Sequence, residues 1–395
     1  MSAASGGPPP AAPGRGASWA HDPERVARAG LMRCCAPTAL VASRLVSHGA
    51  QELWAQLRSG GSPDPTEDLA LAASVGARLV IPDDDEWPGC LADLAAFTAA
   101  SGRPDDRAAG RDHGVPFGLW VRGPARLDEA VCRSAALVGA RAATGYGIHL
   151  AAELGAGLGE RDATVISGGA YGVDAAAHRG ALAVGGRTVA VLAGGIDVAY
   201  PLGNAQLLGR IANDGLIVAE APPGGLARRE RFLTRNRLIA ALSGGVVMVE
   251  AAIRSGAGNT VAHARHLARP RMAVPGPVTS AMSAGCHALL RQDLEARLVT
   301  CAAEVLEEIG RMGADLSSVP PTAADARDEL AEPARLLLAA MPARGPWPLG
   351  RIAIELGVGR TQALALAGAL AAQGWLEQLP EGFRLTPRAR APLVR

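Results

Sequence analysis

The residue types in this chain that could hold an anion are arginines and small residues with accessible backbone N–H groups. The run RRERFLTRNR, residues 228–237, contains five arginines and one glutamate, and the segment SGAGNT, residues 255–260, follows the next apolar run. A guanidinium donates in a planar fork that matches phosphate, and a Gly-rich helix start offers N–H groups to the same ligand. The pattern suits binding of a phosphate chain, although a solvated helix start would also explain the arginines.

Comparable residues follow the other apolar runs that read as buried strands. In parallel α/β sheets, ligands bind beyond the carboxyl ends of the strands. The candidate binding residues are therefore those just after each run, together with the end of the arginine-rich segment. They are Arg141, Ser167, Gly168, Gly169, Asn204, Arg235, Asn236, Arg237, Ser255, Gly256 and Thr260.

Other polar residues form no catalytic or metal-binding pattern. Asp174 and His178 stand four residues apart on one predicted helix, and we interpret them as a structural pair rather than an acid–base couple. His263 and His266 lack a third metal ligand. The acidic run at 83–86 is interpreted as a solvated turn. We predict no catalytic residue and no metal.

Two nucleotide-cofactor patterns are also missing. The segment GARAATGYG after the first apolar run does not have the spacing of the dinucleotide fingerprint G-x-G-x-x-G. A Walker A lysine is impossible because the sequence contains no lysine. We therefore predict no cofactor.

Length and composition predict a protein of two or three domains. The net charge of +1 over 395 residues means that any nucleic-acid surface must be local. The six cysteines form no CxxC pair. No apolar signal core and no run of about 18 apolar residues is present, which predicts a cytoplasmic protein without a membrane span. Aromatic residues make up 3%, which favours phosphate contacts over base stacking.

Apolar runs alternate with amphipathic segments through residues 112–312. This pattern predicts an α/β fold, a Rossmann-like doubly wound parallel sheet with helices on both faces. The expected strands are 134–140, 163–169, 187–195, 215–222, 244–251 and 269–276, and the expected helices are 144–160, 172–185, 203–214, 229–243 and 258–268.

The flanking segments differ in composition from this central domain. Residues 1–21 are rich in Gly, Pro, Ala and Ser and predict a disordered tail, and 22–111 predict a mainly helical domain. Residues 313–328 form a linker, and 329–395 predict a winged-helix domain of three helices and two short strands. Its recognition helix, about 360–373, has a single arginine, which favours packing or protein contact over base reading.

Several spaced blocks resemble the DNA-processing protein DprA (Smf) family. They are VGARAATGYG, ISGGAYGVDAAAHRGAL, TVAVLAGGIDVAYPLGNAQLL, TRNRLIAALSGGVVMVEA, RSGAGNTVAHA and AVPG, spread in order over about 112–312. The N-terminal helices resemble the SAM-like domain of that family, and the C-terminal part resembles its winged-helix domain. Thr234, Ala219 and the Gly-Asn pair in the SGAGNT loop depart from the family's usual residues.

The resemblance implies a non-enzymatic DNA-binding protein. Members of the family bind single-stranded DNA during natural transformation, protect the incoming strand, and load the RecA recombinase; they act as homodimers. Their DNA pocket lies at the strand ends, so the resemblance assigns the eleven candidate residues above to single-stranded DNA.

Two other functions compete with this reading. A Rossmann-fold nucleotide-processing enzyme of the phosphoribohydrolase type carries the motif PGGxGTxxE, but the comparable helix here contains no glutamate. A transcription factor is suggested only by the winged-helix outline. The missing glutamate argues against the enzyme, and the composition of the recognition helix weakens the transcription factor.

Overall fold

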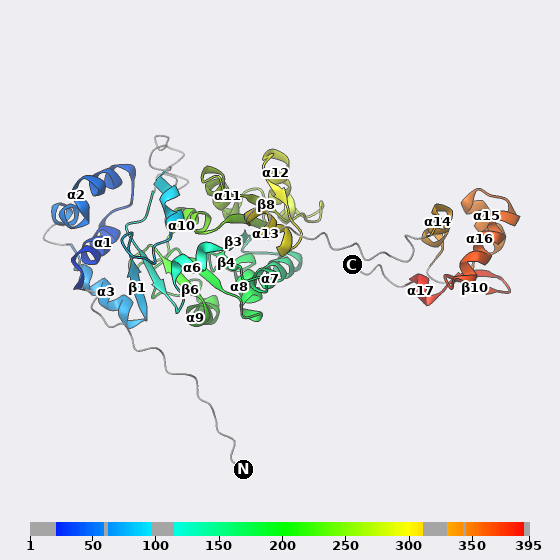
Figure 1. Ribbon diagram of the computed structural model, residues 1–395, viewed down its shortest axis with the longest axis horizontal. Helices are drawn as coiled ribbons and strands as arrows, with labels where there is room; N and C mark the ends of the chain where they lie inside the picture. The colour runs from blue at the N-terminus through cyan, green and yellow to red at the C-terminus, as the bar shows by residue number, and fades with distance from the viewer. Residues whose placement is uncertain (1–20, 59–61, 96–113, 311–329, 343–344, 391–395) are drawn as a thin grey trace, which may run out of the picture. The chain divides into compact units, whose positions relative to one another are not determined.

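The computed structural model describes residues 21–58, 62–95, 114–310, 330–342 and 345–390 (Figure 1). The chain divides into two compact units, Met1–Ser317 and Ser318–Arg395. The predicted linker at 313–328, the domain boundary at 111/112 and all but His21 of the predicted tail lie outside the described residues. Within the described ranges, no helix is both long enough and apolar enough to cross a membrane.

A nine-stranded sheet forms the centre of the first unit, with the strand order β1-β2-β6-β5-β4-β3-β7-β8-β9. The seven strands from β6 to β9 in this order are parallel, whereas β1 and β2 pair antiparallel at one edge. The strands are β1 (Ala77–Val80), β2 (Leu119–Arg122), β3 (Ser134–Gly139), β4 (Thr164–Ser167), β5 (Thr188–Leu192), β6 (Leu216–Ala219), β7 (Gly245–Glu250), β8 (Arg271–Ala273) and β9 (Arg297–Leu298).

Helices cover both faces of this sheet, which confirms the predicted Rossmann-like fold (Figure 1). Every residue of β5 and β7 is buried, as expected for strands covered on both sides. The helices of the central region are α6 (Leu127–Cys132), α7 (Gly145–Gly159), α8 (Val173–Ala183), α9 (Ala205–Asp214), α10 (Arg229–Leu242), α11 (Gly256–His266), α12 (Ala284–Gln292) and α13 (Ala302–Ile309).

The strand order reverses between β3 and β7. The chain runs from β3 through β4 and β5 to β6 on one side, then returns to place β7 and β8 on the other side of β3. The β3–β7 register also shifts after Val138, so that Gly139 pairs with Glu250. Helices that follow strands on the two sides diverge at such a reversal, which leaves a crevice at the carboxyl ends of these two strands.

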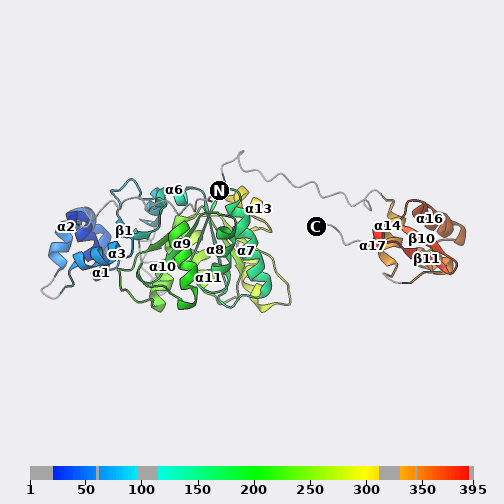
Figure 2. The same ribbon diagram turned by 90° about the horizontal axis from the view of Figure 1, so that it is seen from below.

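Glycines bring α7 and α8 into close contact beside the sheet (Figure 2). A methyl group on Gly180 of α8 would lie 2.0 Å from the carbonyl oxygen of Ala152, and one on Gly155 of α7 would lie 2.3 Å from that of Ala177. Backbone therefore meets backbone across this helix pair. The close packing fixes α8, whose first turn carries Asp174.

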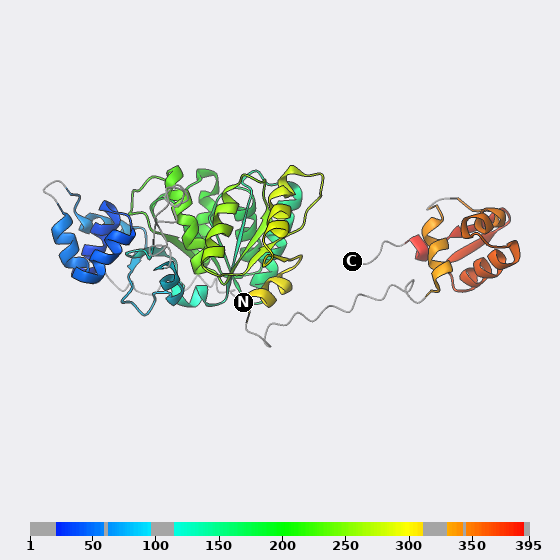
Figure 3. The same cartoon turned by 90° about the horizontal axis from the view of Figure 1, so that it is seen from above.

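Three N-terminal helices pack at the β1 edge of the sheet (Figures 1 and 3). They are α1 (Pro23–Cys34), α2 (Ala39–Leu57) and α3 (Pro65–Ser74), and their apolar faces share a core with Leu79 of β1 and Trp120 of β2. The segment 77–80, inside the range predicted as a mainly helical domain, thus belongs to the large sheet. These helices are part of the same compact unit as the sheet.

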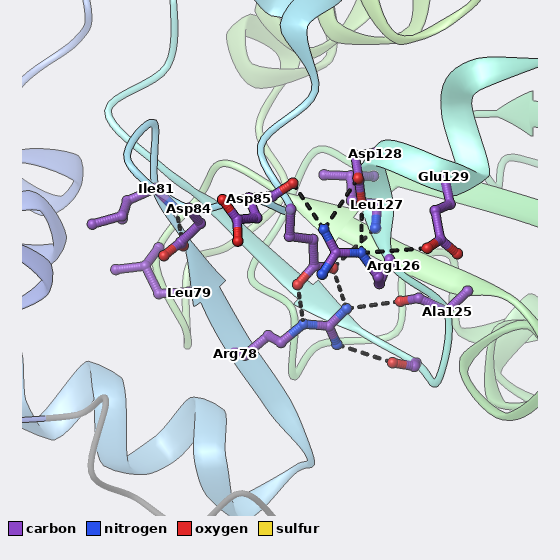
Figure 4. A network of polar contacts seen from close by, with 12 residues as sticks. Arg78, Leu79, Ile81, Asp84, Asp85, Ala125, Arg126, Leu127, Asp128 and Glu129 are labelled. Carbon is purple, nitrogen blue, oxygen red and sulfur yellow. Dashed lines mark hydrogen bonds and ion pairs between the residues drawn. The ribbon is translucent and has the colours of Figure 1, made fainter.

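The acidic run at 83–86 is a turn in which Asp83 and Asp85 are exposed, but Asp84 and Glu86 are not solvated as predicted. Asp84 accepts a hydrogen bond from Arg25 at 2.8 Å, and Glu86 accepts one from Arg78 Nε at 2.9 Å. Arg78 also donates to the Ala125 carbonyl, and Arg126 donates to the Asp85 carbonyl, each at 2.8 Å (Figure 4). Asp84 and Glu86 thus tie β1 to the N-terminal helix and to the segment that follows β2.

The second unit contains three helices and then a two-stranded hairpin, in the order predicted for 329–395. The elements are α14 (Glu332–Ala340), α15 (Leu349–Leu356), α16 (Arg360–Ala372), β10 (Leu376–Leu379), β11 (Gly382–Leu385) and α17 (Pro387–Arg390). Trp375 and Phe383 pack in their common core. On α16, Ala363, Ala367 and Leu370 face this core. The winged-helix assignment itself stays a prediction.

Candidate nucleic-acid interface

A groove opens at the β3/β7 reversal, at the carboxyl edge of the parallel strands. Its volume is about 1030 Å³. Its walls are the segment 138–142 at the end of β3, the first half of α10, and the segment 252–260, which leads into α11. All six residues of the SGAGNT segment, 255–260, line the groove, so the segment predicted to hold an anion forms most of one wall.

Three exposed arginines surround the groove without an acidic partner. Arg141, Arg229 and Arg254 line it, and none of them forms an ion pair within the described part of the chain. The acid among the lining residues is Asp174, which is buried. Uncompensated cations in a concave surface concentrate a positive potential there. Arg254 was not among the predicted site residues, although it directly precedes the SGAGNT loop.

Aromatic rings form part of the groove wall. The Arg141 guanidinium lies over the Phe232 ring, with its carbon 4.7 Å from the ring centroid. Tyr200, which is 46% exposed, has its ring centroid 5.6 Å from that of Phe232. Low aromatic content predicted little base stacking, but the few aromatic residues here gather beside the cations. Phe232 also holds Arg141 in place through a cation–π contact.

Arg235 lies in the floor of the groove rather than at its rim. It is buried and its Nη1 donates to the carbonyl oxygen of Gly168 at 2.9 Å and to that of Val191, while Nε donates to Asn236 Oδ1 at 3.2 Å. The pKa of this guanidinium is lowered to about 10, mainly by burial; the nearby Asp174 carboxylate opposes this shift and Arg141 adds to it. Arg235 therefore remains charged at neutral pH and contributes a fixed positive charge beneath the groove.

Side chains of the protein itself fix the backbone of the loop after β4 through hydrogen bonds. The Asp174 carboxylate accepts hydrogen bonds from the N–H groups of Gly168 at 3.1 Å and Ala170 at 3.3 Å. Ser167 Oγ donates to the Leu137 carbonyl at 2.6 Å, and Asn204 Nδ2 donates to the Gly169 carbonyl at 3.0 Å. The expectation that these N–H groups face an incoming anion is therefore wrong for Gly168, because an internal carboxylate already accepts its hydrogen.

The start of α11 presents the more accessible donors. Ser255 is the residue before the helix and makes no capping hydrogen bond, and Gly256 faces open space. Asn236 Nδ2 donates to Asn259 Oδ1 at 3.0 Å, which ties α10 to this helix start. Thr260 is buried one turn further on. Backbone N–H groups in the first turn of a helix have no intrahelical partner, so this end suits an anion.

Arg237 is fully buried and does not line the groove. Its guanidinium makes two parallel hydrogen bonds to Glu220, with Nη1–Oε2 at 2.9 Å and Nη2–Oε1 at 2.7 Å. Of the predicted site residues, the structure thus gathers one set around the groove and places another beneath or behind it. The first set is Arg141, Arg235, Asn236, Ser255, Gly256 and Thr260; the second is Ser167, Gly168, Gly169, Asn204 and Arg237.

Comparison with known proteins places the chain among DNA-processing proteins. A family model described as DNA recombination-mediator protein A matches residues 78–310. A putative DNA processing protein DprA from Mycobacterium tuberculosis is 46% identical over 371 residues, which cover 91% of this chain and 92% of that protein. The chain belongs to the DprA family.

Two further relatives agree with this assignment. The DNA processing protein DprA of Streptococcus pneumoniae is 39% identical over 194 residues, covering 49% of this chain and 67% of that protein. An X-ray structure of the protein from the same species matches with a TM-score of 0.58 at 27% identity, and the match covers 73% of this chain and 98% of the other. The resemblance noted in the sequence and the predicted fold class are both confirmed.

Histidines in this DprA-family chain show no catalytic or metal-binding arrangement in the described ranges. No group of three or more His, Cys, Asp or Glu side chains there could hold a metal ion. The predicted Asp174–His178 pair is wrong: His178 Nδ1 lies 2.7 Å from Thr188 Oγ1, and that hydroxyl donates to the Val165 carbonyl at 2.9 Å. The Thr188 oxygen therefore accepts from the imidazole. The Asp174 carboxylate instead accepts hydrogen bonds from the loop after β4.

His178 predicts a pH dependence of folding. Burial, together with the nearby charges of Arg235 and Arg179, lowers its pKa from 6.5 to about 3. The unfolded state then takes up a proton more readily, so this contribution to stability is complete above about pH 6.5 and is lost as pH falls toward 3. Between pH 7 and pH 5 the loss is about 2 kcal/mol. Denaturant titrations give the free energy of unfolding at the two pH values. In His178→Gln, the decrease in this free energy from pH 7 to pH 5 should be smaller than in the original protein by about that amount. An unchanged decrease would contradict the buried neutral imidazole.

Two glycines of the site form a matched pair for substitution. A methyl group on Gly168 would lie 2.6 Å from Arg235 Nη2, whereas one on Gly256 would meet no atom within 4 Å. We expect Gly168→Ala to displace the Arg235 guanidinium and to lower the free energy of unfolding by about 1–3 kcal/mol. Gly256→Ala should leave it within about 0.5 kcal/mol of the original. Equal unfolding midpoints in the two variants would show that Arg235 does not pack against the loop as described.

Proposed function

We propose that this chain binds single-stranded DNA in the groove at the β3/β7 reversal. The observation that carries the proposal is the set of exposed arginines, Arg141, Arg229 and Arg254, around a groove whose lining contains one buried acid. Phosphates would contact these guanidinium groups and the start of α11, and bases would meet Phe232 and Tyr200. The contacts are mainly to the backbone, so binding should be weakly sequence-specific and should weaken steeply with salt.

Single strands fit this groove for a physical reason. Arg141 and Phe232 offer a cation and an aromatic surface at one place, and an unpaired nucleotide presents its phosphate and the face of its base together. A duplex keeps its bases stacked inside and would meet only the arginines. We therefore expect a preference for single-stranded over duplex DNA that persists as the salt concentration rises.

The family description, a recombination mediator, supports the finer part of the proposal. We propose that the protein protects single-stranded DNA and loads a RecA-type recombinase onto it, acts as a homodimer, and works in the cytoplasm without catalysing a reaction. In the described part of the groove, the single acid Asp174 already accepts two backbone hydrogen bonds. Among the described residues that line the groove, no free carboxylate is left to act as a general base, which disfavours the phosphoribohydrolase alternative.

The experiment is binding of the purified full chain to labelled single-stranded and duplex oligonucleotides over a salt series. Preference for the single strand with a steep salt slope would support the proposal. Absence of single-strand binding at low salt would reject it, and nucleotide hydrolysis would then be assayed. Recombinase loading would be tested separately, as formation of RecA filaments on single strands coated by a single-strand-binding protein.

A further inference from the structure

A second hollow lies beside the groove, on the other side of Arg235. Its volume is about 290 Å³, and it is formed by residues 32–37 at the end of α1, the ends of β5 and β6, and the first turns of α10. Arg235 lines both this hollow and the groove. A strand leaving the groove along the start of α10 would therefore meet the hollow next.

The hollow carries positive charge that internal acids do not neutralise. Arg33 and Arg231 line it. Arg33 is paired, with Nε 2.6 Å from Asp68 Oδ2, but Arg231 donates to the Leu226 carbonyl at 3.1 Å and forms no ion pair within the described residues. Burial lowers the pKa of the Arg231 guanidinium, and Arg228 and Arg33 lower it further. Arg231 is therefore a partly exposed cation of the hollow that no acid pairs within the described residues.

The carboxylate that lines the hollow is already ion-paired with an arginine. Glu220 lines it, but both of its carboxylate oxygens accept hydrogen bonds from Arg237. The floor is apolar, with Met32, Phe117 and Leu192 among its residues. An apolar floor beneath a cationic rim, in a space close to the lower limit for small-ligand pockets, suits one flat heterocycle with a phosphate attached.

We propose that this hollow is a nucleotide-sized subsite, which receives one unstacked base of the single strand beyond the groove and holds its phosphate on Arg231. The inference rests on the function proposed above and extends the path of the DNA toward α1. It assigns the N-terminal helices a part in binding, because residues 32–37 form one wall. The subsite is reached only by a strand long enough to pass Arg235, so its contribution depends on the length of the oligonucleotide.

The test compares two deoxythymidine oligonucleotides, of about 6 and about 20 nucleotides, within and beyond the usual range of single-strand sites. Arg231→Ala removes the unpaired cation. Ala36→Leu fills the hollow without changing charge, at a loop position that is partly exposed. Each should weaken binding of the longer oligonucleotide about fivefold to tenfold and leave that of the shorter one unchanged. Circular dichroism and unfolding midpoints of both variants establish that they are folded.

Arg141→Ala and Arg187→Ala separate the two proposals. Arg141→Ala should weaken binding at both lengths, and Arg187→Ala at neither, because Arg187 is exposed and directly precedes β5, at the opposite edge of the sheet. If Arg141→Ala lowers the affinity for the oligonucleotides but Arg231→Ala and Ala36→Leu do not, the subsite is overturned and the proposal for the groove is retained. Equal loss at both lengths in Arg231→Ala would also overturn it, because the hollow would then be part of the groove. No effect of Arg141→Ala at either length would count against the groove itself.

Discussion

Arg141→Ala is expected to weaken single-stranded DNA binding about tenfold and to reduce the slope of log affinity against log salt by about 0.7. Arg141 is exposed, lies over Phe232, and has no ion pair in the described ranges, so its charge is available to a phosphate. Fluorescence anisotropy over a salt series measures both quantities. Replacing Arg141, Arg229 and Arg254 together should lower the slope by about 2, since each removes one released counterion.

The conservative variant and a remote control sharpen this result. Arg141→Lys keeps the charge but loses the planar fork that stacks on Phe232, so its affinity should fall between those of the original and Arg141→Ala, with the original slope. Arg187→Ala removes an exposed charge at the far edge of the sheet and should change neither quantity. An Arg141→Ala variant with the original salt slope would mean that this guanidinium does not meet a phosphate.

The central fold could be predicted because its signals are local. The expected strand at 134–140 and helix at 229–243 match β3 (Ser134–Gly139) and α10 (Arg229–Leu242) within one residue at each end. Continuous apolar strands separated by helices admit few arrangements other than a covered parallel sheet. The pairing of β1 with β2 was not predicted, because an antiparallel edge strand depends on contacts between residues 77–80 and 119–122, which lie far apart in the sequence.

The groove could be placed from the sequence, but the direction of each side chain could not. Most candidate residues follow predicted strands, and that position locates an edge of the sheet rather than a surface. Gly168 illustrates the difference: its N–H lies at the predicted edge, yet it donates to Asp174 from the next helix. The acceptor of a loop N–H group depends on how α8 packs against the sheet, and the local sequence pattern does not predict that packing.

Arg235 and Arg237 show the same limit on a single helix. Residues two apart on a helix point in different directions, so one guanidinium reaches Gly168 and the other reaches Glu220. Charge taken along the chain predicts that the arginine-rich segment forms one cationic surface, because the sequence does not show which side of the helix each arginine occupies. In the structure, Arg229 is exposed at the groove while Arg235 and Arg237 are buried.

Arg237→Ala is expected to lower the free energy of unfolding of the first unit by about 3–5 kcal/mol. The Arg237 side chain is 0% exposed and that of Glu220 is 21% exposed. Removing the guanidinium would leave the partly buried Glu220 carboxylate without its two hydrogen bonds. Denaturant titration followed by far-ultraviolet circular dichroism measures the loss. Arg237→Met with Glu220→Gln should recover part of it, because the pair is then replaced by groups without net charge.

DNA binding by these variants decides what Arg237 contributes. The resemblance assigns it to DNA, whereas its burial and its pairing with Glu220 assign it to the support of α10, on which Arg229, Phe232 and Arg235 stand. If the support explanation is right, the double variant should bind single-stranded DNA nearly as well as the original protein wherever both are folded. Loss of DNA binding in a folded double variant would instead make Arg237 a direct contact, provided that Arg141→Ala in the original chain still weakens binding as expected. DNA affinity, measured under conditions in which both proteins are folded, therefore distinguishes the two explanations, whereas stability measurements alone do not.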